Sequence, residues 1–432
     1  MKGGLLIAGV VVLILLGVPL FVLLGGLSFG LFTAYEELSP EALLKYILET
    51  LAKPALLSIP LYILAGALVS KGRAAQKLVE VAQAWLGWLP GGLAVTAVLA
   101  CMVFGAISGS SPVTMVAIGS FLYPAMKRAG YPDSLALGSV TVGGSLGILI
   151  PPSIPMIVYG IVTRTDIEKL FLASIIPGLW AGGILILIAV ILGMWKRLPR
   201  STFSLKEALR KTFFAIPALG LPVVVLGGIY AGLYNITEAA GVAVLYLFLL
   251  EGIGYRALRW KELRDTLAEA TTALGSILAI VLMAALLSYF LLLAELPFKV
   301  VEYVMELQLT PIKFILIVVG VLLIAGMVMD VLSAILIFAP AFLPAAQNLE
   351  VSPILLGVVF ILALEVGYLT PPVGLNLFVA MGYFQRSMGA VVKASFPFLL
   401  GLLITLGLLI LFPNLFGLSL VEALEPLGGV EM

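Results

Sequence analysis

The sequence has no histidine and a single cysteine, Cys101, among its 432 residues. One cysteine excludes a disulfide framework, and without histidine the usual ligand sets of zinc peptidases and haem proteins are missing. Charged residues make up only 11% of the chain, against about 25% in soluble globular domains. The net charge of +1 gives no basic stripe for nucleic acid. Metalloenzymes, disulfide-rich proteins and nucleic-acid-binding proteins are therefore disfavoured.

Hydrophobic residues are abundant instead, at 62% of the chain. Many apolar runs reach the roughly 18 residues that cross a bilayer as a helix. This predicts an all-α, polytopic protein embedded in a lipid bilayer. Residues 3–33 are predicted to be a retained membrane segment rather than a signal peptide, because no small-residue cleavage site follows. They form one long tilted span, or two short ones that turn at Pro19.

Two stretches resemble each other across half of the chain. GILIPPSIP begins at Gly147 and GYLTPPVGLN at Gly367, 220 residues apart. The same offset pairs Pro124 with Pro344, Ala125 with Ala345, and Pro177 with Pro397. We interpret this as an internal duplication. Adjacent prolines break a helix, and in lipid a broken helix persists only where it is buried in protein or lines a cavity. Matched breaks in two repeats are the best sequence indication of a transporter's midplane binding site.

Each predicted break is preceded by two short apolar arms. In the first repeat the arms are 91–107 and 112–126, separated by the sequence SGSS; in the second they are 312–328 and 332–346, with Asp330 at the tip. About 15 residues of helix span about 22 Å, less than the bilayer core of roughly 30 Å, so the arms predict re-entrant hairpins. Basic residues flank the first hairpin, whereas the flanks of the second carry little net positive charge. The first should open to the cytoplasm and the second to the outside, as inverted repeats require.

These elements divide the chain into five parts. Residues 1–90 are predicted to form N-terminal scaffold helices and an amphipathic interfacial arm. Residues 91–195 hold the first hairpin (91–126) and the first broken helix (134–163). Residues 196–311 form a basic cytoplasmic loop and further scaffold helices. The second hairpin (312–346) and broken helix (354–384) lie within 312–413, and 414–432 is an acidic tail.

Breaking a helix exposes carbonyls that suit a sodium ion and amides that suit a carboxylate. The predicted sodium ligands at the tips and breaks are Ser108, Ser110, Ser111, Gly147, Ile150 and Pro152 in the first repeat, and Gly326, Gly367, Thr370 and Val373 in the second. The predicted substrate-binding residues are Ser153, Asp330 and Asn376. The alternative is that these small residues only allow close helix packing, as is common in membranes.

Asp330 interrupts an otherwise apolar run, and an intramembrane acid indicates a functional site unless it is paired structurally. The structural alternative is that it pairs with backbone amides at the hairpin tip. Glu365 and Glu238 are interpreted as interfacial or structural acids. Arg164 and Arg386, which follow the broken helices, are interpreted as ordinary boundary charges.

The segment from Gly91 to Gly160, which contains SGSS and ILIPPSIP, resembles the large membrane subunit (DctM-like) of tripartite ATP-independent periplasmic (TRAP) transporters. LLSIPLYILAG, LFLASIIPGLW and EVGYLTPPVGLNLFV, which begin at Leu56, Leu170 and Glu365, do so as well. The likeness covers nearly the whole chain. It departs from the family at Pro112-Val113, where small residues are usual, and at Ala67-Leu68-Val69, where a methionine is frequent.

The resemblance implies an elevator-type, sodium-coupled importer of small organic acids of the dicarboxylate, sialic-acid or keto-acid kind, in the bacterial inner membrane. It implies no covalent catalysis and no cofactor apart from sodium as coupling ion. It also implies two partners, a small four-helix membrane subunit (DctQ-like) and a periplasmic solute-binding protein (DctP-like).

Two other classes compete with this interpretation. One is a self-sufficient sodium/dicarboxylate or sodium/proton elevator carrier, which shares paired hairpins but needs no binding protein. The other is an intramembrane enzyme. Such enzymes need convergent acids or a Ser/His pair, and this sequence has neither histidine nor paired intramembrane aspartates.

Overall fold

The computed structural model describes residues 18, 20–35, 40–52 and 54–423, and all regular structure in these ranges is helical. Eight helices of the described residues are long and apolar enough to cross a membrane. The predicted all-α membrane class is therefore confirmed. Whether residues 3–33 cross once or twice depends on residues outside the described ranges. The end of the predicted acidic tail, residues 424–432, also lies outside them.

The helices of the first half are α2 (Leu20–Tyr35), α3 (Pro40–Leu51), α4 (Ser58–Lys71), α5 (Ala74–Leu86), α6 (Gly92–Ser108), α7 (Ser111–Arg128), α8 (Asp133–Leu149), α9 (Ile154–Thr163) and α10 (Ile167–Trp195). Those of the second half are α11 (Leu205–Tyr230), α12 (Ile236–Leu249), α13 (Trp260–Leu293), α14 (Leu296–Glu306), α15 (Pro311–Val328), α16 (Val331–Asn348), α17 (Pro353–Tyr368), α18 (Leu375–Phe384), α19 (Met388–Leu411) and α20 (Leu418–Ala423). Short 3₁₀ or π turns lie at 54–57, 250–254 and 413–416.

The helix pattern recurs along the chain. α7 and α16 both have 18 residues and begin at Ser111 and Val331, 220 positions apart. The first residues of α6 and α15, of α8 and α17, and of α10 and α19 follow the same spacing to within one residue. Pro124 lies inside α7 as Pro344 lies inside α16, and Pro177 lies inside α10 as Pro397 lies inside α19.

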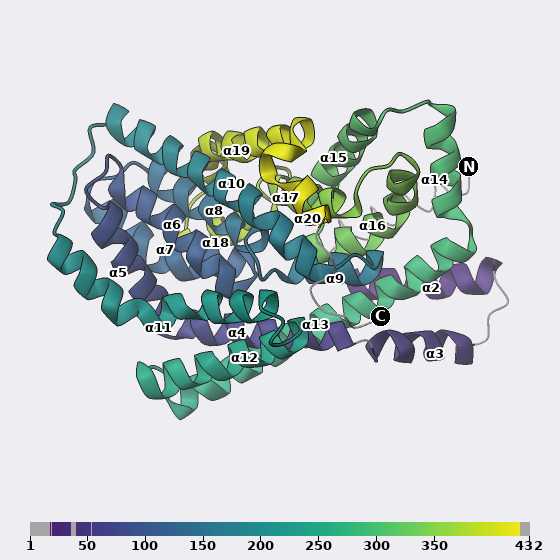
Figure 1. Cartoon of the computed structure of the whole chain (residues 1–432), viewed down its shortest axis with the longest axis horizontal. Coiled ribbons are helices and arrows are strands. Elements are labelled where there is room, and N and C mark those ends of the chain that lie inside the picture. The colour runs from purple at the N-terminus through teal and green to yellow at the C-terminus, as the bar shows by residue number, and fades with distance from the viewer. Residues whose placement is uncertain (1–17, 19, 36–39, 53, 424–432) are drawn as a thin grey trace.

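The broken helix α8–α9 lies at the centre of the molecule. In the 18-residue apolar stretch of this span 83% of the residues are buried. The corresponding share in the other candidate spans is 29% to 50%. α8 packs against α6, α7, α10 and α19, and α17 packs against α15, α16, α10 and α19. Figure 1 shows α2, α4, α11, α12 and α13 along one long edge of the molecule, with α15 and α19 at the opposite edge. The first break is therefore enclosed between layers of helices.

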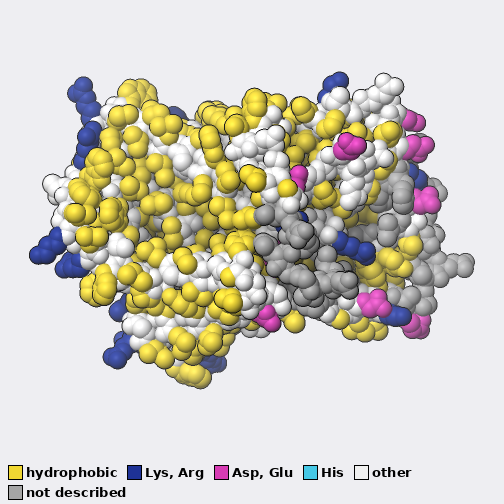
Figure 2. All heavy atoms as spheres, viewed as in Figure 1, with side chains coloured by type: hydrophobic (Ala, Val, Ile, Leu, Met, Phe, Trp, Pro, Cys, Tyr) yellow, Lys and Arg dark blue, Asp and Glu magenta, His cyan; other side chains and the backbone are white. Residues whose placement is uncertain are grey.

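The visible surface matches a protein that crosses a bilayer along its long axis. Figure 2 shows a broad hydrophobic band, with Lys and Arg gathered at one end and most Asp and Glu at the other. The basic end holds the α10–α11 connection, whose exposed residues include Lys196, Arg197 and Arg200. Basic loops tend to stay in the cytoplasm, which is the reason for the predicted side of that loop; its side stays a prediction.

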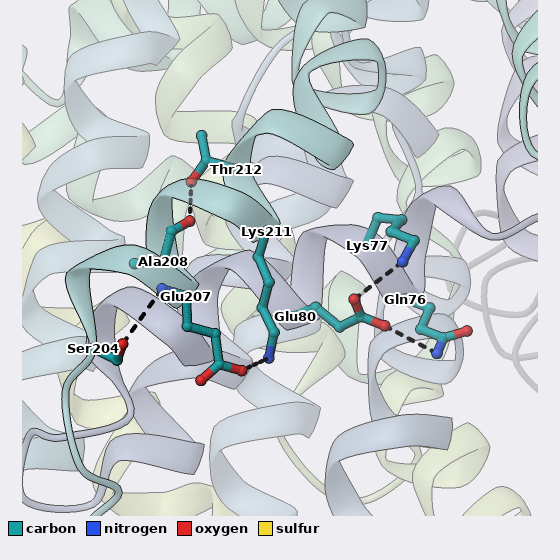
Figure 3. A network of polar contacts seen from close by, with 8 residues as sticks. All are labelled: Gln76, Lys77, Glu80, Ser204, Glu207, Ala208, Lys211 and Thr212. Atoms are coloured by element: carbon teal, nitrogen blue, oxygen red, sulfur yellow. Dashed lines mark hydrogen bonds and ion pairs between the residues drawn. The ribbon is translucent and has the colours of Figure 1, made fainter.

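The amphipathic arm α5 is tied to the helices beside it. Within α5, Glu80 accepts hydrogen bonds from Gln76 and Lys77, and within α11, Glu207 pairs with Lys211; the link between the two helices lies beside these contacts (Figure 3). The Trp85 indole N–H donates to Thr212 Oγ1 on α11 at 2.9 Å.

The start of α5 is fixed by a buried acid. Glu251, in the π turn after α12, accepts hydrogen bonds from the backbone amides of Arg73 and Ala74, each at 2.8 Å. A Cβ on Gly72 would lie 2.0 Å from the Glu251 carboxyl carbon, so a larger residue there would displace this carboxylate. These contacts hold the arm against the outer helices.

Candidate functional site

The first hairpin tip and the first break touch each other. α6 and α8 approach so closely that a Cβ on Gly105 would lie 2.4 Å from the Cα of Gly147. Between α6 and α7 the chain turns through Gly109, which has a φ of 57° that favours glycine. Ser108 Oγ and Thr114 Oγ1 share a hydrogen bond of 2.6 Å across this turn. The predicted residues Ser108, Ser110, Gly147 and Pro152 are thus brought together.

The second hairpin tip meets the second break in a similar way. A Cβ on Gly367 would lie 2.8 Å from the Cα of Gly326, so α15 and α17 are also in backbone contact. The amide of Gly374, which ends the break, donates to the carbonyl of Met327 at 3.0 Å. Small residues are required at these contacts because any side chain would push the tip away from the break.

Asp330 begins α16 at the second tip. Its Oδ1 accepts the backbone N–H of Ser333 at 3.0 Å, and its Oδ2 accepts the Ser333 hydroxyl. This is the structural alternative considered for Asp330, a helix cap. Each carboxylate oxygen of Asp330 accepts one hydrogen bond in this cap and can accept a second. The side chain is half-buried beside the break.

The breaks run from Ile150 to Ser153 and from Leu369 to Gly374, and both contain a cis bond between the two prolines. The side chain of Ile150 points to Gly178 on α10, so only its backbone can serve a ligand at the break. Thr370 Oγ1 donates to the Val366 carbonyl at 2.7 Å. Val373 is half-buried.

The two repeats are also joined to each other. α7 of the first hairpin packs against α18 of the second broken helix, and α16 of the second hairpin packs against α9 of the first. At the α7–α18 contact Ser111 Oγ donates to Glu365 Oε1 at 2.7 Å. Asn376 Nδ2 donates to the same Oε1 at 3.0 Å and also contacts Ser111 Oγ. Ser111, Glu365 and Asn376, here called the central cluster, bring a predicted sodium ligand and a predicted substrate ligand to one point.

Glu365 was interpreted as an interfacial or structural acid, and the interfacial alternative is wrong. Its side chain is 1% exposed and sits between the repeats, because α17 is covered by helices on all sides. The signal that points to it is its place two residues before Gly367 in the second break motif. Glu238 is structural as predicted, since it forms a capping box with Asn235 at the start of α12.

Comparison with known families agrees with this architecture. Residues 7–415 match the family model described as "Tripartite ATP-independent periplasmic transporter, DctM component". The chain belongs to the DctM family. The resemblance of the SGSS and di-proline motifs to that family is therefore confirmed, and the chain is a transporter component rather than an enzyme.

Two relatives and one solved structure show the extent of the likeness. The DctM chain is 42% identical to the C4-dicarboxylate TRAP transporter large permease protein DctM of Pseudomonas aeruginosa, over 83% of this chain and 84% of the relative. It is 34% identical to the ectoine TRAP transporter large permease protein TeaC of Halomonas elongata, over 95% and 97%. The YdaH transporter of Alcanivorax borkumensis shares the fold, with a TM-score of 0.62 at 16% identity over 94% and 98% of the two chains.

The DctM site contains three buried oxygens without hydrogen-bond donors among the described residues: Ser153 Oγ, Glu365 Oε2 and Asn376 Oδ1. The side chains that carry them are at most 1% exposed. Buried polar atoms normally find a partner, so oxygens left free at a site indicate a ligand.

The part of the chain that the structure describes has no group of three or more His, Cys, Asp or Glu for a metal ion. Oxygens with so little charge suit a monovalent cation better than a multivalent metal.

Proposed function

We propose that this DctM chain is the large membrane subunit of a sodium-coupled importer of small organic acids that receives its substrate from a periplasmic binding protein. The observation that carries the proposal is the meeting of both hairpin tips with both helix breaks around buried, partly unpartnered oxygens. Half-helix ends aimed at such a point bind a coupling cation by their carbonyls and an anion by their amides.

The proposed sodium sites are the two contacts between tip and break. In the first repeat the ligands come from Ser108, Ser110 and Ser111 and from the backbone of Gly147, Ile150 and Pro152. In the second they come from Gly326, Gly367, Thr370 and Val373. The substrate carboxylate lies between them, near Ser153, Asp330 and Asn376. Binding of sodium completes the tips, and this gives the substrate its affinity.

Transport would follow an elevator movement of the two hairpins and broken helices as one body. Backbone contact between α6 and α8, and between α15 and α17, makes each tip and break a rigid unit. The cross-packing of α7 on α18 and α16 on α9 joins the two units. α4, α11, α12 and α13 on the outer edge would stay with the fixed scaffold, and α5 would connect it to the moving body.

The word "tripartite" in the family description supports the two predicted partners, a DctQ-like membrane subunit and a DctP-like periplasmic protein. The complex would lie in the bacterial inner membrane, with the basic end of the molecule in the cytoplasm. The relatives are named for C4-dicarboxylates and for ectoine, which supports small carboxylate substrates as a class rather than one compound.

The test is uptake into proteoliposomes that contain the chain and its small membrane subunit. Radiolabelled succinate and ectoine are offered with and without an inward sodium gradient, and with and without the binding protein. The proposal expects uptake of at least one organic acid only when sodium and the binding protein are both present. Uptake without the binding protein would instead place the chain among self-sufficient carriers, and uptake without sodium would contradict the coupling.

A further inference from the structure

The central cluster contains a buried acid, Glu365, that forms no ion pair with a Lys or Arg of the described residues. Glu365 Oε1 accepts two hydrogen bonds, from the Ser111 hydroxyl and the Asn376 amide, and both donors are neutral. Glu365 Oε2 and Asn376 Oδ1 have no donor. Glu365 is 1% exposed and Asn376 0% exposed, so bulk solvent does not reach either side chain.

The helices of the cluster supply no counter-charge. Glu365 is the only charged residue of α17, and α18 has none. On α7 the basic residues, Lys127 and Arg128, stand in the last turn, about 24 Å along the helix from Ser111. The helices packed on α17 place Lys313, Lys393 and Lys169 near their own first turns, and Asp133 begins α8. Tyr368 lies within electrostatic reach of both Glu365 and Asp330, so the nearby charge of the second tip is also negative.

An ionised carboxylate is strongly disfavoured at such a depth unless a cation or hydrogen-bond donors compensate it. Two donors already occupy Oε1, which leaves Oε2 as the oxygen free to take a ligand. The other free acceptor, Asn376 Oδ1, belongs to the amide that is bonded to the same carboxylate. Both unpartnered atoms are oxygens, and a single small cation bound between the two groups would satisfy both.

We propose that Glu365 and Asn376 form a sodium site at the boundary between the two repeats, in addition to the sites at the two hairpin tips. The proposal rests on the proposed function for the identity of the ion. Ser111 and the Asn376 amide orient the carboxylate, while Glu365 Oε2 and Asn376 Oδ1 are the ligands. Because Ser111 comes from the first repeat and the other two residues from the second, an ion at this site would stabilise the arrangement in which the two repeats are joined.

The test counts sodium ions directly, without substrate or binding protein. The full chain in lipid nanodiscs is titrated with radioactive ²²Na⁺, with choline as the replacing cation. The variants are Glu365→Gln, which keeps the shape but removes the charge, and Asn376→Ala, which removes the second ligand. The matched control is Glu306→Gln, since Glu306 is exposed at the end of α14.

Glu365→Gln should bind one sodium ion fewer per chain than the unsubstituted protein. Asn376→Ala should raise the half-saturating sodium concentration of one ion by roughly tenfold, since a bond to a charged group changes affinity by about that factor. Glu306→Gln should change neither quantity.

The proposal is wrong if either Glu365→Gln or Asn376→Ala, recovered as a monodisperse protein, binds sodium with unchanged number and affinity. If Glu365→Gln kept its sodium binding but lost proton transport, Glu365 would be a proton-binding residue instead. That result would also overturn the sodium site. A failure of the proposed function looks different. Uptake would then lack dependence on sodium or on the binding protein, while the sodium count of the variants would still distinguish Glu365 from Glu306.

Discussion

The two breaks carry the same proline pair but are not equally accessible. In the first, Pro151, Pro152 and Ser153 are all buried. In the second, Pro371 and Pro372 are exposed and Val373 is half-buried. The tips follow the same division, since Ser108 and Gly109 are buried whereas Met329 and Asp330 are half-buried. One repeat is therefore closed around its break, and the other is open.

The residues around each tip explain the difference. Gly66 on α4 lets that helix approach the first tip, because a Cβ there would lie 3.0 Å from the Ser108 carbonyl oxygen. Gly178 on α10 makes room for Ile150 of the first break. The positions 220 residues later hold Leu286 and Phe398, so neither glycine has a counterpart in the second repeat. Leu286 packs with Phe32, Leu43 and Phe290, and Phe398 lies against Gly138 on α8.

The largest effect should come from glycines at the tip–break contacts. Gly105→Ala forces backbone apart and should destabilise the protein by about 1–3 kcal/mol. Gly326→Ala meets the Leu364 carbonyl oxygen at 2.7 Å and the Cα of Gly367 at 3.0 Å, a looser contact, and should cost less. Thermal unfolding of the purified variants measures both values.

The controls for this comparison are glycines at which an added Cβ would make no close contact. Gly143→Ala on α8 would make only ordinary contacts at 3.5 Å, and Gly320→Ala on α15 would meet nothing within 4 Å. Each should be neutral, or stabilising by about 0.5–1 kcal/mol, because alanine favours a helix. Equal destabilisation by Gly105→Ala and Gly320→Ala would show that the close approach is unimportant.

The accessibility of the two breaks can be measured by cysteine labelling. Ser153 and Val373 are equivalent positions of the two repeats, and the only native cysteine, Cys101, is buried. A maleimide should modify Val373→Cys at least about tenfold faster than Ser153→Cys, because the buried position reacts only after local opening. Equal rates would remove the difference between the repeats. The unsubstituted protein should stay unlabelled and serves as the control.

The tips also differ in how the second arm begins. Ser110 and Asp330 are equivalent N-cap residues, but Ser110 makes no side-chain capping bond whereas Asp330 accepts from Ser333. Asp330→Ala should cost about 1 kcal/mol, Asp330→Asn should retain the cap, and Ser110→Ala should be nearly neutral. Thermal unfolding separates these outcomes.

Uptake assays on the same variants separate cap from ligand at Asp330. Asp330→Asn preserves the helix but removes the charge, so a role in binding predicts a loss of sodium-driven uptake of roughly tenfold. Full uptake by Asp330→Asn would show that Asp330 only caps the helix. The open break would then have no charged ligand.

The sequence predicts some of these features and not others, for physical reasons. Paired prolines at Pro151 and Pro371 break a helix wherever they occur, so both breaks were predictable. Glu365 was misplaced because its burial depends on Ser111, a partner 254 positions away, and on how α7 packs against α17 and α18. Local patterns indicate where a helix ends. They do not reveal which of two equivalent breaks is covered.

The smallest effects should come from the outer ends of the two short half-helices. After α18, the Arg386 guanidinium donates to the Tyr123 hydroxyl at 2.9 Å and lies 3.6 Å from Asp133, so this boundary charge joins α7 and α8. In α9 the corresponding link to the other repeat is one hydrogen bond, from the Tyr159 hydroxyl to the Pro353 carbonyl at 2.9 Å.

These two links should respond differently to substitution and to salt. Tyr159→Phe leaves a carbonyl without its donor and should cost about 1 kcal/mol at any ionic strength. Arg386→Met removes an exposed ion pair and should cost less than about 1 kcal/mol, with the loss disappearing in high salt. Unfolding measured at low and high sodium chloride tests the pair. A larger, salt-independent loss for Arg386→Met would mean that the ionic link, rather than the buried hydrogen bond, holds the half-helices to the neighbouring repeat.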